Sequence, residues 1–129
     1  MKNDILTAAE VKRMVDEFYG KVRKDTLLGS IFNGAIQDRW PEHLAKMCRF
    51  WQAVLFQEQG YHGNPFAPHA QLPIGREHFD RWLLLFYETL DENFQGEKTE
   101  EARWRAEKMA EMFHSKIEFY KNSSSKPLI

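Results

Sequence analysis

Apolar residues recur at helical spacing along the first part of the chain. Between residues 8 and 25 they fall on one side of a helix, at Val11, Met14, Val15, Phe18, Tyr19 and Val22. Thr7, followed three residues later by Glu10, has the spacing of a capping box, in which side chain and backbone hydrogen-bond reciprocally. The pattern therefore predicts an amphipathic helix that begins after Thr7 and ends near Asp25.

The next helical pattern has two apolar faces. It begins near Pro41, a residue that suits a first helical turn, and runs to about Gln57. One face carries Leu44, Cys48, Trp51 and Leu55, and the other carries His43, Met47, Phe50 and Val54. A helix with two apolar faces has two surfaces to bury. Before this helix, Gly29 is predicted to mark a turn, with Ile31 and Phe32 in a short connecting segment.

Two further helices are predicted in the second half of the chain. One runs from about Glu77 to Phe94 and is apolar on most sides, so we expect it to be the most buried helix. The other runs from about Glu97 to Lys121, with an inner stripe of Ala102, Ala106, Met109, Phe113, Ile117 and Tyr120. No strand-like alternation or internal repeat is present. The patterns predict an all-α chain with four helices in two pairs.

Composition narrows the class of protein. The chain has 129 residues, of which 43% are hydrophobic and 14% aromatic, enough for one domain over residues 1–129 with a frayed polar tail from about 122. A formal net charge of −1 and dispersed cations disfavour nucleic-acid binding. The lone Cys48 fits a reducing compartment, and no segment reaches the roughly 18 continuous apolar residues of a membrane span. We therefore expect a soluble cytoplasmic protein.

The segment between the second and third helices is an unusual loop. Residues 58–75 read EQGYHGNPFAPHAQLPIG, with three glycines and three prolines, so a long regular helix is unfavourable. Loops of this length are often functional. Prolines on both sides of His69 stiffen its backbone, which suits an imidazole held at a fixed angle to a haem iron. From the residues alone, an ordinary surface-loop histidine remains the alternative.

The remaining histidines do not form a metal-binding pattern. Zinc sites use pairs such as HxxxH or CxxC, and di-iron bundles use Glu-x-x-His repeats, and neither occurs here. We expect three of these histidines at the surface, namely His62, His78 and His114.

Four stretches, in order and in register, resemble the group III truncated haemoglobins. They are FYGKVRKD followed by IFN, EHLAKMCRFW, YHGNPFAPHAQLP and EHFDRWLLLF, and the resemblance covers roughly residues 8 to 120. It implies a two-over-two helical sandwich around haem b, which agrees with the two predicted helix pairs. The glycine-pair motifs of groups I and II are missing, as group III requires.

The resemblance also implies a role for individual residues. His69 resembles the proximal iron ligand. Three residues resemble the distal hydrogen-bond donors, namely Tyr19, His43 and Trp82. Alternatives stay open: Tyr19 at the edge of the core, Trp82 in the plain core, and His43 directed to solvent. Phe32 resembles the phenylalanine that packs on the porphyrin.

Further haem contacts are expected around this set. Met47 lies over the distal face, where isoleucine or leucine is more usual, so the size of the distal pocket is open. Apolar contacts are expected from Phe50, Phe66, Leu72 and Phe79. Partners for the haem propionates are expected from Lys46, Tyr61 and Arg76.

These residues favour a particular kind of function. Oxygen at a haem iron carries partial negative charge, so each donor stabilises it by about 1 to 2 kcal/mol, or roughly tenfold in affinity. Tight binding and slow release suit redox chemistry of O2, NO or peroxide better than bulk transport. The resemblance thus implies binding of O2, NO and CO, with nitric oxide dioxygenase or peroxidase-like activity as candidates. We expect a monomer served by an unidentified electron-donor reductase. The alternatives are a haem-based sensor and a cofactor-free helical interaction module.

Overall fold

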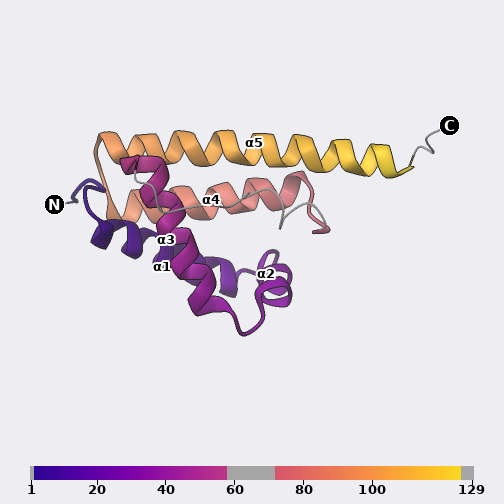
Figure 1. The fold of residues 1–129 in the computed structure, drawn as a ribbon, viewed down its shortest axis with the longest axis horizontal. Coiled ribbons are helices and arrows are strands. Elements are labelled where there is room, and N and C mark those ends of the chain that lie inside the picture. The colour runs from indigo at the N-terminus through magenta and orange to yellow at the C-terminus, as the bar shows by residue number, and fades with distance from the viewer. Residues whose placement is uncertain (1, 58–71, 126–129) are drawn as a thin grey trace.

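The computed structural model describes residues 2–57 and 72–125, with side chains as far as residue 119. The helices are α1 (Ala8–Lys24), α2 (Gly29–Ile36), α3 (Trp40–Phe56), α4 (Arg76–Asn93) and α5 (Glu97–Ser125). In Figure 1, α4 and α5 lie side by side along the longest axis, while α3 crosses them steeply. α1 packs against α2, α3 and α4. The predicted all-α class is confirmed.

α1 forms as its sequence predicts. The Thr7 N–H donates to Glu10 Oε1 at 2.9 Å, and the Thr7 hydroxyl accepts from the Ala9 N–H at 3.3 Å, within a complete capping box. The buried residues are those of the predicted stripe, namely Val11, Met14, Val15, Phe18, Tyr19 and Val22. This buried face includes Tyr19, which is 6% exposed.

The segment after α1 is a helix, not the connecting segment that we predicted. α2 has no side-chain hydrogen bond from its own N-cap residue. Instead, the Asp25 carboxylate accepts from the Leu28 N–H and from the N–H before it, both at 3.0 Å. Gly29 fits closely behind α1, since a Cβ there would lie 2.9 Å from the Arg23 carbonyl oxygen. The described residues therefore form five helices, where four were predicted.

The other helices are close to prediction, with one difference in bounds and one in burial. α5 continues to Ser125, so residues 122–125 extend the helix where we expected a frayed tail. α4 is not the most buried helix, as we had expected, because five of its 18 residues are buried against six of 17 in α1, and Leu84 is 45% exposed. None of the helices within the described part of the chain is long and apolar enough to cross a membrane.

The segment before α1 caps the start of α5. The Asp4 carboxylate accepts from the Lys98 N–H at 2.9 Å, and from the Thr99 N–H and hydroxyl, both at 2.8 Å. Burial raises the pKa of Asp4, but these hydrogen bonds outweigh it and the pKa lies below its ordinary value. Gly96, at φ +140°, permits this approach, since a Cβ there would lie 2.4 Å from Asp4 Cγ.

Candidate functional site

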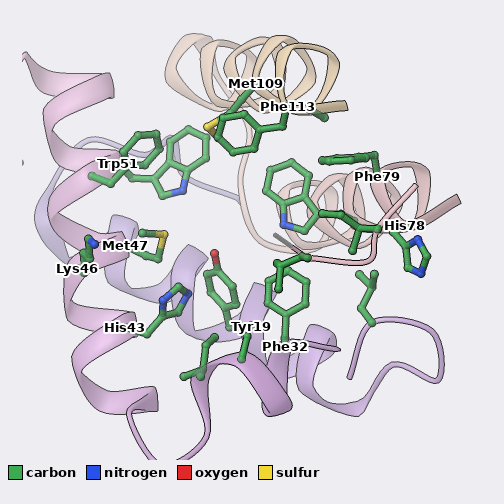
Figure 2. A pocket seen from close by; sticks show the side chains of 18 of the residues that line it. Tyr19, Phe32, His43, Lys46, Met47, Trp51, His78, Phe79, Met109 and Phe113 are labelled. Carbon is green, nitrogen blue, oxygen red and sulfur yellow. The ribbon is translucent and has the colours of Figure 1, made fainter. Parts of the chain in front are cut away.

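A cavity of about 540 Å³ opens between the helices (Figure 2). Every described helix contributes to its wall, and this volume is within the range of small-molecule and cofactor sites. Much of the wall is large and apolar, with Phe32, Met47, Phe50, Trp51, Phe79, Trp82 and Phe113. Such a wall suits a large, flat and mainly apolar ligand.

Tyr19 brings a polar group into this apolar space. Its side chain is 6% exposed, and Figure 2 shows its hydroxyl directed into the cavity. Burial raises the pKa of the phenol well above its ordinary value, so it stays protonated. Within the described residues, this hydroxyl makes no hydrogen bond. It is therefore a donor available to a ligand in the cavity.

His43 reaches the cavity from α3, beside Tyr19. The two rings meet edge to face, with centroids 5.1 Å apart and planes at 88°. The imidazole Nε2 is buried, and Met47 lines the cavity one turn further along the helix. The second polar group of the wall therefore lies next to the first (Figure 2).

Trp82 lines the cavity from α4. Its ring stacks on Phe86, with centroids 5.8 Å apart and planes at 4°, and meets Phe18 edge to face at 5.4 Å. These contacts fix the indole from behind, on the side of the core. The wall opposite α3 is thus rigid and aromatic.

Charged residues gather where α3 begins. Arg39, Glu42 and Lys46 all line the cavity. The Arg39 guanidinium is already engaged with the end of α2, donating to the Ala35 carbonyl at 2.9 Å. Lys46 has no ion-pair partner in the parts of the chain that the structure describes, which leaves its ammonium available to an anionic group of a ligand.

The structure brings together most of the predicted site residues. Those that line the cavity are Tyr19, Phe32, His43, Lys46, Met47, Phe50, Leu72, Phe79 and Trp82. Three others, Tyr61, Phe66 and His69, lie outside the described residues. Arg76 is not part of the wall: its side chain is 82% exposed and its Nε lies 3.7 Å from Asp80 Oδ2. At the start of α4 it faces solvent and pairs one turn along the helix, and its contact with a haem propionate at the rim stays a prediction.

His78 is a cavity residue that we expected at the surface. Its side chain is only 14% exposed, and Nδ1 accepts from the Gly75 N–H at 2.9 Å. This bond fixes the proton of the neutral imidazole on Nε2. The signal in the sequence was its position, three residues after a glycine at a helix start, where a side chain can fold back over the first turn.

The sequence analysis also did not predict that residues of α5 form part of the cavity wall. Met109 and Phe113, which we had predicted only as part of the inner stripe of a helix, line the cavity together with Ala110. Helical periodicity reports that a face is buried and does not say whether it is buried against protein or against a ligand.

The geometry defines a helical fold with an aromatic cavity, and comparison with known proteins gives its class. Residues 3–117 match the family described as bacterial-like globin. The group 3 truncated hemoglobin ctb of Campylobacter jejuni is 36% identical over 124 residues, which cover 93% of this chain and 98% of that protein. The crystal structure of group III truncated hemoglobin from the same organism matches with a TM-score of 0.82 and 36% identity, over 91% of this chain and 95% of that one.

Fold and sequence thus agree on a bacterial-like globin. Within that class, the chain belongs to the group III truncated haemoglobins. Membership in this family implies that the protein binds haem, and oxygen at the haem iron.

Proposed function

We propose that this chain binds haem b in the cavity, with His69 as the proximal iron ligand, and takes up oxygen and related diatomic molecules beside Tyr19. The observation that carries the proposal is the Tyr19 hydroxyl, which is directed into an aromatic cavity and makes no hydrogen bond within the described residues. When bound, haem supplies an iron that takes diatomic ligands. The residues of the chain supply the shape and polarity of the pocket around it.

The described residues fit such a group. Phe32 and Phe79 offer aromatic surface to a flat ring, and Lys46 offers a cation to a propionate. Tyr19 offers an O–H, and His43 and Trp82 offer N–H groups. Several donors in a largely apolar pocket stabilise a polar ligand more strongly than the same donors in water.

This set of donors favours slow release of oxygen. We therefore infer that the protein carries out redox chemistry of oxygen, nitric oxide or peroxide, supplied with electrons by a separate reductase, rather than bulk transport of oxygen. Nitric oxide dioxygenation and peroxidase-like activity are the two candidate reactions.

The visible absorption spectrum tests the haem site. After addition of haem, the wild type is expected to show a Soret band with globin-like reduced and carbon monoxide spectra, and His69→Ala is expected to weaken or alter them. His62→Ala, seven residues earlier in the sequence, is the matched control. A wild type that takes up no haem would end the proposal. If His69→Ala binds haem like the wild type, His69 is not the ligand, and His43 is the next residue to substitute.

Replacing Tyr19 by phenylalanine is expected to speed oxygen release about tenfold, because one donor to the ligand is lost. The ring that packs 4.8 Å from Phe18 is kept, so the fold should be unaffected. Stopped-flow displacement of oxygen by carbon monoxide measures the rate. Tyr87→Phe is the control, since that hydroxyl donates to Glu107 outside the cavity. An unchanged rate in Tyr19→Phe would remove Tyr19 from contact with the ligand.

A further inference from the structure

Trp40, the first residue of α3, lies beside the cavity without lining it. Its side chain is 5% exposed, and its ring lies 5.9 Å from that of Tyr19 and 5.6 Å from that of His43. The Tyr19 and His43 rings also meet each other. The three rings form a closed group, the aromatic triad of Tyr19, Trp40 and His43, of which only Tyr19 and His43 reach the cavity.

The Trp40 indole is held from outside the cavity. Its Nε1 donates to Asn33 Oδ1, on α2, at 3.1 Å. The Arg23 guanidinium, from α1, lies 4.6 Å from the ring centroid, at cation–π distance. The Asn33 amide in turn donates to the Arg23 carbonyl at 3.3 Å, which joins the two supports. The position of the indole is therefore set by α1 and α2, independently of any ligand.

His43 follows Trp40 by three residues, so the two side chains lie on one face of α3. The imidazole plane is at 88° to both the Tyr19 ring and the Trp40 ring. Edge-to-face contact on two sides leaves the imidazole one favourable orientation. A small side chain at position 40 would leave a void beside the imidazole, into which that ring could turn.

We propose that Trp40 is a positioning residue that, with Asn33 and Arg23, holds the His43 imidazole against Tyr19. It thereby fixes the spacing of two donors inside the cavity without touching the ligand. The consequence for a bound ligand rests on the proposed function, whereas the ring arrangement itself does not.

Nuclear magnetic resonance of the full chain tests the ring arrangement. In the wild type we expect cross-relaxation between the ring protons of His43 and Tyr19. In Trp40→Leu this signal should fall about two- to tenfold, the range expected for loss of one edge-to-face contact. Trp40→Phe keeps an aromatic ring but loses the hydrogen bond to Asn33, so its signal should lie between those of the wild type and Trp40→Leu. Asn33→Ala should lower it by freeing the indole. Trp104→Leu is the matched control, since Trp104 is 54% exposed on α5.

Oxygen release gives the second readout. In the haem-loaded protein, Trp40→Leu is expected to change the release rate two- to tenfold relative to Trp104→Leu, with Trp40→Phe closer to the wild type. Wild-type cross-relaxation in both Trp40→Leu and Asn33→Ala would overturn the proposal, as would an equal loss in Trp104→Leu. If the chain takes up no haem, the proposed function fails and the ring measurements still decide the role of Trp40. If Trp40→Leu does not fold, Trp40→Phe and Asn33→Ala decide it.

Discussion

Replacing Phe86 by alanine is expected to lower the free energy of unfolding by about 3 to 5 kcal/mol. Phe86 is 1% exposed and lies where three helices meet. Its ring stacks on Trp51 of α3 at 5.3 Å and on Trp82 of α4 at 5.8 Å, and meets Phe18 of α1 edge to face at 5.1 Å. Alanine would leave a void that these rigid rings cannot fill.

Urea denaturation measures this effect, with all variants in the same state of haem loading. Leu84→Ala, two residues earlier on the same helix, is the matched control. Leu84 is 45% exposed, so its loss should cost less than about 1 kcal/mol. Phe86→Leu should fall between the two. A Phe86→Ala value equal to that of Leu84→Ala would contradict the prediction.

The same substitution should also weaken the binding of haem. Trp51 and Trp82 line the cavity and rest on Phe86, so the void would let both rings move. Titration of haem into Phe86→Ala should therefore give a lower affinity than titration into Leu84→Ala. Equal affinities would show that the two indoles are held by their other contacts.

Replacing Asp25 by alanine is expected to cost about 2 to 4 kcal/mol. The carboxylate is 2% exposed and joins three elements. It accepts from two N–H groups at the start of α2, and from Nε and Nη2 of Arg81 on α4, both at 2.6 Å. Alanine would leave these donors without an acceptor. Because the Arg81 side chain is 41% exposed and can be rehydrated, the loss should be smaller than for a fully buried pair.

The contribution of Asp25 should depend on pH in a definite direction. Burial raises the pKa of Asp25, but the hydrogen bonds from Arg81 and from the backbone outweigh it, so the pKa lies below its ordinary value. An unfolded aspartate titrates near pH 3.9. The stabilisation is therefore fully present above this pH and is lost as the pH falls through the lower pKa of the folded state.

A comparison with asparagine isolates this charge. The difference in unfolding free energy between the wild type and Asp25→Asn should be largest near neutral pH and should shrink below about pH 4. Asp38→Asn, at an exposed position between α2 and α3, is the control. A difference that stays constant down to pH 2 would mean that the charge of Asp25 does not stabilise the fold.

Most of the helices could be predicted because their determinants are local. The capping box and the apolar stripe of α1 lie within consecutive residues, and Pro41 marks the first turn of α3. α2 could not be predicted in this way. Its eight residues are too few for a clear period, and its start is held by Asp25 from the end of α1.

Site residues whose position follows from the family resemblance could be predicted from the sequence. Site residues whose position depends on the direction of the side chain could not. Tyr19, His43 and Trp82 lie in the cavity as expected, while their contacts with haem remain predictions. His78 and Arg76 lie two residues apart at the start of α4, and the predicted surface position of His78 was wrong. A hydrogen bond from Gly75 turns His78 inward, whereas Arg76 is exposed with its Nε 3.7 Å from Asp80 Oδ2. Sequence spacing does not contain this information.

The cap that Asp4 places on α5 has a consequence for synthesis of the chain. Asp4 and Thr99 are separated by 95 residues, a stretch that a ribosome takes about 5 to 20 s to make. During this time the amino-terminal segment has been made but its binding site has not. α1 likewise emerges well before α4, against which it packs. The growing chain therefore carries α1 with its apolar face uncovered for seconds before α4 has been made.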